Sequence, residues 1–433
     1  MKQKLAVKEI MALGFFMFAL FLGAGNLIFP PVLGQQAGES IWPAIVGFLV
    51  TGVGLPLLAV ITISNVGGDL DVLSKRVHKS FALVFPVVIY LTIGPFFGIP
   101  RTGVVAYEVG VVPFLSSPSG LSLFLSTLVF FSITFWLALN PAKLVDRVGK
   151  VLTPILFILI VIISIRAFIS PLGEIDRATD SYIEGAFFTG FLEGFLTMDA
   201  IAALVFGIVI INRIQEKGVG SVRDIRSYTI KAGIIAGVGL SFVYLALAYI
   251  GATSVNALGM LENGGAILSA VTSHLFGPFG TVLLAVVITG ACLTTSIGLV
   301  SACGEFLTKR FNRVSYPVII AVLCLFSFTM ANLGLNQLIA FSLPLLIAIY
   351  PITIVLICLS ILHLAKPIYS SVYMGAIIGA AIVSIYDGLT MAGLDVEFIR
   401  AAFIYLPLYT NGVGWLLPSL VGGLLGYLFQ RNV

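Results

Sequence analysis

Twelve apolar stretches follow one another along the chain, and only short polar segments separate them. A helix that spans a bilayer needs about 20 apolar residues. Hydrophobic residues make up 59% and charged residues 10% of the 433 positions, which is not the composition of a soluble globular protein. We therefore predict an all-α polytopic membrane protein with a single transmembrane domain, residues 1–433. The predicted spans are 10–33, 41–64, 82–112, 121–139, 151–169, 186–211, 229–250, 277–306, 316–331, 338–362, 369–391 and 411–429.

The basic residues predict which side of the membrane each loop faces, because short loops rich in Lys and Arg stay in the cytoplasm. With a cytoplasmic N-terminus, most of the 23 Lys and Arg residues fall on the cytoplasmic side of the twelve spans. Both termini are then cytoplasmic, and the net charge of +4 reflects topology rather than nucleic-acid binding. The first stretch is too long for a cleaved signal sequence, so we expect it to be retained as a span.

The first predicted span is interrupted at its centre. Within Phe18–Pro31 the apolar pattern is broken by Gly23, Ala24, Gly25 and Asn26, and the segment closes with two prolines. Lipid cannot hydrogen-bond unpaired peptide groups, so an unwound segment at membrane depth needs protein, water, an ion or a solute as a partner. Glycines that merely allow close helix packing are the alternative. We expect a binding site here, with amides that suit a carboxylate and carbonyls that suit a cation.

The sixth predicted span has a matching interruption. Between Gly190 and Asp199, two glycines, a threonine and two carboxylates interrupt the apolar pattern. Many secondary transporters consist of two inverted repeats whose first helices are both discontinuous. We predict repeats of five spans at 10–169 and 186–362, with two additional helices in 369–429. The outer segment 251–276 fits a re-entrant or lid-like element.

A pair of hydroxyls in the eighth span suits a sodium ion. Thr294 and Thr295 follow Ala291 by one helical turn, so two hydroxyls and one carbonyl can face one point. Hard cations prefer about five or six oxygen ligands, and carbonyls of the first span could supply the others. The alternative is that these hydroxyls bond to carbonyls of their own helix, which is frequent in membranes.

Few charges lie inside the predicted spans, and each is costly enough in lipid to indicate a function. Arg101 and Glu108 are seven residues apart on one helical face, which predicts an ion pair or a gate with help from Tyr107; a purely structural pair is the alternative. Glu193 and Asp199 lie at the second interruption, and Asp199 is a further candidate for the gate or ion pair. The spans carry no HExxH, GxSxG or phosphate-binding loop, so we expect no enzymatic activity.

Four longer motifs resemble a known family: LGAGNLIFPPVLGQQAG (22–38), IGPFFGIPRTGVVAYEVG (93–110), EGFLTMDAIAALVFGIVI (193–210) and TGACLTTSIGLVSACGE (289–305). The resemblance is to the bacterial branched-chain amino-acid:cation symporters of the BrnQ type, and it extends over nearly the whole chain. It implies uptake of leucine, isoleucine and valine across the bacterial cytoplasmic (inner) membrane, coupled to sodium or protons. It also implies a LeuT-type fold of two inverted five-helix repeats with broken helices 1 and 6.

A more distant resemblance to sodium-coupled LeuT-type carriers implies roles for single residues. Gly23, Ala24, Gly25 and Asn26 match the unwound segment that binds the substrate carboxylate. The resemblance places a sodium ion between the carbonyls of Ala19 and Leu22 in the first span and Ala291, Thr294 and Thr295 in the eighth. In the sixth span, the carbonyls around Phe195 and Thr197 are expected to meet the substrate ammonium. We expect Phe195, Phe96 and Phe97 to form an aromatic wall for the branched side chain; phenylalanines that belong to the core or face lipid are the alternative. The predicted substrate site is Gly23, Ala24, Gly25, Asn26, Phe97, Glu193, Gly194, Phe195 and Thr197.

Three classes of function remain to be separated: a secondary transporter, a channel and a membrane-embedded enzyme. Paired broken helices favour alternating access, whereas no continuous polar pore lining and no convergent catalytic groups are evident in the sequence. We predict symport of leucine, isoleucine or valine with Na+. H+ is the alternative, and it would need an acid such as Glu193 or Asp199. We expect the lipid bilayer as surroundings and no obligate protein partner.

Overall fold

The computed structural model describes residues 5–139 and 141–429, which form α-helices joined by short turns and include no strand. The α-helices are α1 (Val7–Phe21), α2 (Ala24–Ala37), α3 (Ile41–Leu49), α4 (Leu55–Ser64), α5 (Leu70–Lys75), α6 (Lys79–Leu91), α7 (Gly98–Gly110), α8 (Gly120–Ala138), α9 (Pro141–Ile169), α10 (Asp180–Ile183), α11 (Ala186–Glu193), α12 (Asp199–Gln215), α13 (Val222–Leu258), α14 (Gly264–Arg310), α15 (Tyr316–Ala331), α16 (Leu335–Ala365), α17 (Ser370–Met391), α18 (Glu397–Phe403) and α19 (Leu416–Leu428). The helices α3 and α4 are joined by the π-helical segment η2 (Val50–Gly54), and the helices α6 and α7 by the π-helical segment η3 (Thr92–Phe96).

Each predicted span lies on one of these helices or on a pair of them. Among the described residues, eight helical segments are long and apolar enough to cross a membrane, and three further apolar helices are shorter. The difference from twelve arises partly because α2, α3 and α4 follow one another almost without interruption over Ala24–Ser64. A sharp turn at Gly38, which has φ 46°, separates α2 from the next span. The predicted all-helical membrane fold is confirmed.

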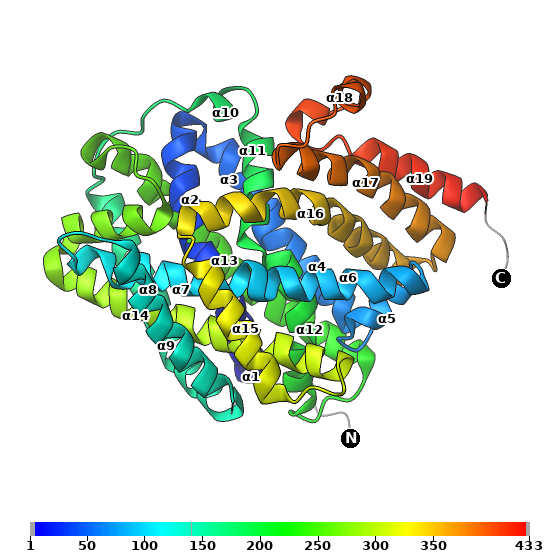
Figure 1. Cartoon of the computed structure of the whole chain (residues 1–433), viewed down its shortest axis with the longest axis horizontal. Helices are drawn as coiled ribbons and strands as arrows, with labels where there is room; N and C mark the ends of the chain where they lie inside the picture. The colour runs from blue at the N-terminus through cyan, green and yellow to red at the C-terminus, as the bar shows by residue number, and fades with distance from the viewer. Residues whose placement is uncertain (1–4, 140, 430–433) are drawn as a thin grey trace.

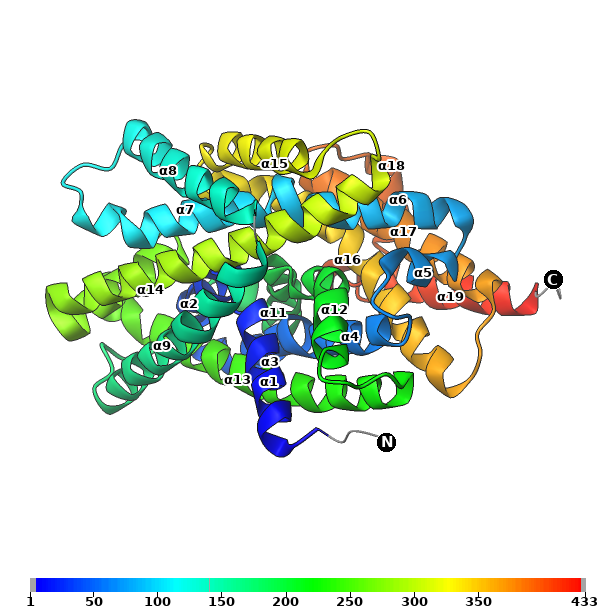
Figure 2. The ribbon, with the colours of Figure 1, turned by 90° about the horizontal axis from the view of Figure 1, so that it is seen from below.

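The two broken helices lie at the centre of the bundle. Figure 1 and Figure 2 show α2, α11 and α12 among the other helices, with α1 running towards them from the N-terminus, α8 and α9 towards one end of the long axis and α17 and α19 at the other. The helix α2 packs on α13 and α14, and α12 packs on α4. The two interruptions are thereby brought into the interior, where lipid does not reach them.

Glycines allow the central helices to approach one another closely. A Cβ atom at Gly34 of α2 would lie 1.9 Å from the Ala248 carbonyl oxygen of α13, and one at Gly251 would lie 2.0 Å from the Pro31 carbonyl oxygen. Any side chain at either position would therefore force the two backbones apart. The C-terminal pair uses the same device: a Cβ at Gly375 of α17 would lie 2.1 Å from the Gly422 carbonyl oxygen of α19.

The outer segment 251–276 is more regular than the sequence suggested. Its first part continues α13 to Leu258, and its last part begins α14 at Gly264. The helix α14 bends at Gly277, which has φ 63° and precedes Pro278. A Cβ at Gly264 would lie 1.9 Å from the Ile28 carbonyl oxygen. This helical hairpin, Gly251–Phe276, therefore lies directly on α2.

The third span contains a break that the sequence analysis did not predict. Non-helical backbone at Gly94, with φ −84° and ψ −120°, interrupts the span between α6 and α7. Pro95 follows and cannot donate a helical hydrogen bond. A Cβ at Gly94 would lie 2.7 Å from the Cys303 sulfur of α14. The glycine therefore lets the bend rest against α14, and the bend sets the direction of α7.

Candidate functional site

The first broken helix is interrupted over only two residues. The helix α1 ends at Phe21 and α2 begins at Ala24. The amide of Leu22 donates to the Phe18 carbonyl at 2.8 Å, and the amide of Gly23 donates to the Phe21 carbonyl at 2.7 Å. By the geometry of an α-helix, the first amides of α2 and the last carbonyls of α1 have no partner within their own helix. The break therefore presents donors and acceptors to the same small region.

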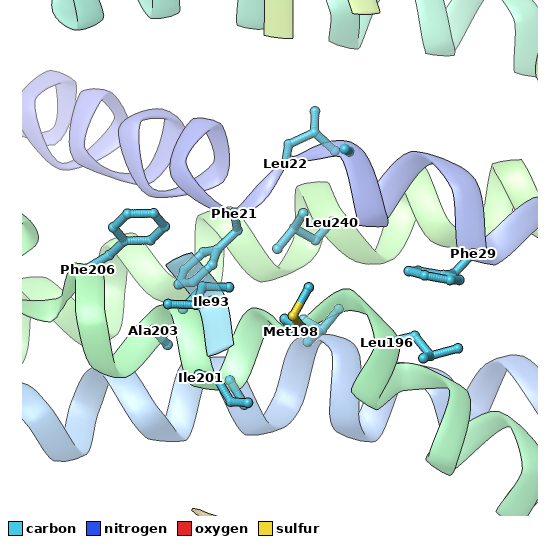
Figure 3. Close-up of a cluster of buried hydrophobic side chains, with 14 of the residues drawn as sticks. Phe21, Leu22, Phe29, Ile93, Leu196, Met198, Ile201, Ala203, Phe206 and Leu240 are labelled. Atoms are coloured by element: carbon cyan, nitrogen blue, oxygen red, sulfur yellow. The ribbon is translucent and has the colours of Figure 1, made fainter. Parts of the chain in front are cut away.

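The second broken helix is interrupted where a short 3-10 segment, η5 (Gly194–Thr197), ends. Met198 then takes a left-handed conformation, with φ 62° and ψ 13°, and α12 begins at Asp199. A non-glycine residue in this conformation is uncommon and often marks a functional position. Figure 3 shows Phe21, Leu22 and Phe29 of the first broken helix gathered with Leu196, Met198 and Phe206 of the second. The predicted breaks in helices 1 and 6 are confirmed.

A buried polar network joins the two breaks. Asn26 accepts the Gly23 amide at Oδ1, 3.0 Å away, and donates from Nδ2 to Asp199 Oδ2 at 2.5 Å. The Tyr244 hydroxyl of α13 donates to the same carboxylate oxygen at 2.8 Å and also accepts from Asn26 Nδ2. Asn26, Asp199 and Tyr244 are each almost fully buried. The sequence analysis singled out Asn26 and Asp199 separately but missed Tyr244.

Arg101 lies between the two breaks rather than beside Glu108. Its Nη1 donates to the Leu196 carbonyl at 2.5 Å, and its guanidinium carbon lies 5.0 Å from the centre of the Phe29 ring. The predicted partner Tyr107 instead shares a hydrogen bond of 2.7 Å with Ser122. Seven residues along a helix correspond to about 10 Å, so Arg101 points into the centre while Glu108 lies two turns away. In the described part of the chain, Arg101, Tyr107 and Glu108 therefore form no hydrogen bond or ion pair with one another, and their gating role stays a prediction.

The predicted sodium ligands come from two elements that meet at the first break. A Cβ at Gly23 would lie 3.5 Å from the Thr295 methyl carbon, so α14 touches the interruption at this residue. The Thr294 hydroxyl donates to the Ala291 carbonyl at 2.8 Å, which is the intrahelical bond considered as the alternative. Ala19 lies in the last turn of α1, and Leu22 follows that helix. The structure thus places Thr295 next to the break, while a sodium ligand role for the five residues stays a prediction.

The other predicted substrate residues have different surroundings. The Thr197 hydroxyl donates to the Gly194 carbonyl at 2.9 Å. The backbone carbonyl oxygen of Thr197 would lie 3.4 Å from a Cβ at Gly25. The Phe195 ring stacks on Tyr350 of α16, with ring centres 4.3 Å apart. Glu193 is the last residue of α11 and is only partly buried.

The predicted aromatic wall is more dispersed. Phe97 is buried at the start of α7, and its ring centre lies 6.1 Å from that of Phe96, which packs on Phe326 of α15. Ala24 and Gly25 form the first turn of α2, and Gly194 begins η5. Gly25 and Thr197 therefore lie close together, while Phe195 and Phe97 each have their own aromatic neighbours.

A cavity of about 720 Å³ opens beside the two broken helices. Phe16 and Leu20 of α1, Val205 and Val209 of α12 and Gly298 of α14 line its apolar part, and charged residues surround it, including Asp69, Arg213, Glu305, Lys309 and Arg310. The charged residues lie at the end of, or just after, the second, sixth and eighth predicted spans. All three loops carry the basic residues that predict the cytoplasmic side.

Solved structures with low sequence identity have the same fold. Mhp1 in its inward facing conformation matches with a TM-score of 0.65 at 14% identity, over 97% of this chain and 90% of that chain. MhsT in complex with L-phenylalanine matches with a TM-score of 0.54 at 16% identity, over 99% of each chain. These similarities show a LeuT-like fold.

Sequence comparisons identify the family. A model of the branched-chain amino acid transport protein family matches residues 6–433. The branched-chain amino acid permease BraB of Bacillus subtilis is 50% identical over 99% of this chain and 97% of its own length. The permease BrnQ of Escherichia coli K12 is 42% identical over 100% of this chain and 98% of its own length. The relatives are permeases, so this membrane protein is a transporter and not an enzyme. The chain belongs to the branched-chain amino acid transport protein family.

Proposed function

We propose that this protein is a secondary active symporter that imports leucine, isoleucine and valine together with Na+ by alternating access. The substrate class is supported by the names of the permeases that are 42% and 50% identical to the chain. The mechanism is supported by the pair of broken helices that meet in the interior. We further propose that the protein lies in the cytoplasmic membrane with both termini in the cytoplasm, as the basic loops predict.

The amino-acid backbone of the substrate binds between the two breaks in this proposal. The first amides of α2, at Ala24, Gly25 and Asn26, are suited to a carboxylate because they are unpaired and lie at the positive end of the helix dipole. The last carbonyls of η5, around Thr197, are suited to the ammonium group for the opposite reason. The Thr197 carbonyl faces Gly25, so one small zwitterion can reach both helix ends.

Sodium binds, in this proposal, at the side of the first break that faces α14. The carbonyls of Ala19 and Leu22 and the oxygens of Ala291, Thr294 and Thr295 are neutral oxygen ligands of the kind hard cations prefer. The observation that carries the assignment is the contact between Thr295 and Gly23, because this contact brings the part of α14 that carries the two hydroxyls next to the break. The Thr294 hydroxyl donates its proton to the Ala291 carbonyl, which leaves the lone pairs of its oxygen for the ion.

Alternating access accounts for the unequal closure of the two sides. The cavity next to α1, α12 and α14 opens among the basic loops. On the opposite side the hairpin Gly251–Phe276 covers α2, and Gln35 donates to Ser254 at 2.8 Å and accepts from the Leu261 amide at 3.1 Å. We propose that this arrangement is the state open to the cytoplasm. The outward-open state would require this hairpin to separate from α2.

Proton coupling is the second candidate. The observation that favours it is Asp199, a buried carboxylate held at the break by Asn26 and Tyr244. A group that takes up and releases a proton at this position would alter the bonds that join the two broken helices. In this version Asp199 would carry the coupled proton, and Thr294 and Thr295 would have no direct role in coupling.

Reconstitution into liposomes tests the proposed function. Vesicles of purified protein would receive radiolabelled leucine outside, with a sodium gradient, a pH gradient or no gradient. We expect accumulation above the external concentration only with inward-directed sodium, and competition by isoleucine and valine but not by lysine or glutamate. Equilibration without accumulation would indicate a channel. Accumulation driven by a pH gradient in the absence of sodium would replace Na+ by H+.

A further inference from the structure

Arg101 is a buried cation whose side chain is only partly satisfied. It is 2% exposed. Nη1 donates to the Leu196 carbonyl at 2.5 Å, whereas Nε and Nη2 have no hydrogen-bond partner in the structure. Asp199 attracts the guanidinium electrostatically, but the two form no direct ion pair among the described residues. A buried charge without a paired counter-ion is expensive, and buried N–H groups without an acceptor add to that cost. The position therefore favours an anion next to the guanidinium.

The two unpartnered atoms lie on the same edge of the guanidinium group. Their N–H bonds point nearly parallel, which matches the spacing of the two oxygens of a carboxylate. The acid closest to the break, Asp199, is already bonded through Oδ2 to Asn26 and Tyr244. The free edge thus has the geometry for a second carboxylate, which none of the described residues supplies.

The Nη1 end of the guanidinium lies against the start of α2. A Cβ at Gly25 would lie 3.1 Å from Arg101 Nη1, 3.4 Å from the Phe29 ring and 3.4 Å from the Thr197 carbonyl oxygen. Gly25 is the second residue of a 14-residue helix, so its amide belongs to the unpaired first turn. Only glycine leaves space where the guanidinium, the first amides of α2 and the end of η5 converge.

We propose that Arg101 binds the carboxylate of the transported amino acid through Nε and Nη2, together with the first amides of α2. This inference rests on the proposed amino-acid substrate and assigns Arg101 as a further binding residue. The Phe29 ring, whose centre lies 5.0 Å from the guanidinium carbon, holds the cation in place. The role differs from the gate with Glu108 that the sequence suggested.

Paired ligands test the proposal directly. L-leucine and L-leucinamide share the ammonium group and the side chain, but the amide lacks the negative charge. Apparent affinities of the purified full-length protein can be measured from the rise in melting temperature with ligand concentration. We expect Arg101→Gln to weaken leucine binding roughly 10- to 100-fold, the range for a lost charge-assisted hydrogen bond. Leucinamide binding should change far less, so the ratio of the affinity for leucine to the affinity for leucinamide should fall sharply.

Two further variants complete the test. Arg101→Lys keeps the charge but lacks the two parallel N–H groups of the guanidinium. It should therefore lower the preference for leucine over leucinamide, and it provides the test if Arg101→Gln does not fold. Arg166→Gln, at an exposed position on α9, should leave both affinities unchanged. Equal weakening of both ligands by the Arg101 variants, or a preference unchanged in Arg101→Lys, would overturn the proposal. A wild-type protein that binds no leucine would overturn the proposed substrate itself.

Discussion

Asn26 of α2 donates a hydrogen bond to Asp199 of α12 across 2.5 Å, and this bond ties the two broken helices together at their interruptions. Asn26 also caps the break in its own helix, because its Oδ1 accepts the Gly23 amide. A substitution at either residue therefore alters the hydrogen bonding at both breaks. The Tyr244 hydroxyl completes the network from α13.

Removal of the Tyr244 hydroxyl should destabilise the protein measurably. Tyr244→Phe keeps the ring, which packs edge-on against Phe48, but deletes the donor to Asp199. A hydrogen bond to a charged group contributes about 1.5–3 kcal/mol. The melting temperature should fall further than in Tyr316→Phe, whose hydroxyl bonds to neutral partners, the Ala138 carbonyl and Ser301. Equal losses in the two variants would contradict a special role for this network.

Loss of two hydroxyls on α14 should lower the affinity of the transporter for sodium. Thr294→Ala together with Thr295→Ala removes two oxygen ligands from the proposed site without adding bulk. The sodium concentration for half-maximal leucine uptake should rise on the order of tenfold or more, as expected when ligands to a hard cation are lost. Thr329→Ala is the matched control, because its hydroxyl also bonds within its helix but at an exposed position on α15. An unchanged sodium dependence in the double variant would remove these residues from the site.

The two acids of the sixth span should behave differently if protons drive uptake. Asp199→Asn keeps an oxygen that can accept from Tyr244 and Asn26 but cannot exchange a proton, whereas Glu193 lies at the end of α11 and is only partly buried. Under sodium coupling, Asp199→Asn should retain sodium-driven accumulation at a reduced rate. Under proton coupling it should abolish pH-driven accumulation while Glu193→Gln does not. Uptake along imposed gradients in liposomes separates these cases.

The fold could be predicted from the sequence because the bilayer allows few alternatives. Apolar stretches must form helices, and an interruption such as that around Gly23 must lie in the interior. The breaks at Leu22 and at Met198 fall where glycines and polar residues had indicated them. The bend at Gly94 was missed because a single Gly-Pro step inside a long apolar stretch is also compatible with a continuous, kinked span.

The site was only partly predictable, since side chains from distant spans meet there. Tyr244 gave no signal, because one tyrosine in an apolar helix is as common in cores as in sites. Arg101 and Glu108 share a helical face, and that spacing favoured a pair. The direction of α7 after the bend instead brings Arg101 to Leu196, 95 residues further along the chain. Sequence spacing determines faces within one helix but not the distances between helices.

Gln35 should control the closure of the side that we propose faces away from the cytoplasm. Its side chain donates to Ser254 at 2.8 Å and to the Gly259 carbonyl at 3.2 Å, and accepts the Leu261 amide at 3.1 Å. Gln35→Ala removes all three bonds, each of which contributes about 0.5–1.5 kcal/mol. Hydrogen exchange of the loop between α13 and α14, Leu261 above all, should therefore accelerate at least roughly tenfold.

The neighbouring residue provides the control for this experiment. Gln36 bonds to Thr179 through its backbone carbonyl alone, so Gln36→Ala should leave exchange at Leu261 near the wild-type rate. If Gln35 holds the hairpin on α2, Gln35→Ala should also speed the labelling of a cysteine introduced at the buried Ala252 by a membrane-impermeant reagent added outside. Faster exchange without faster labelling would mean that Gln35 orders only the loop. Unchanged exchange would show that the glycine contacts at Gly34, Gly251 and Gly264 hold the outer side closed without it.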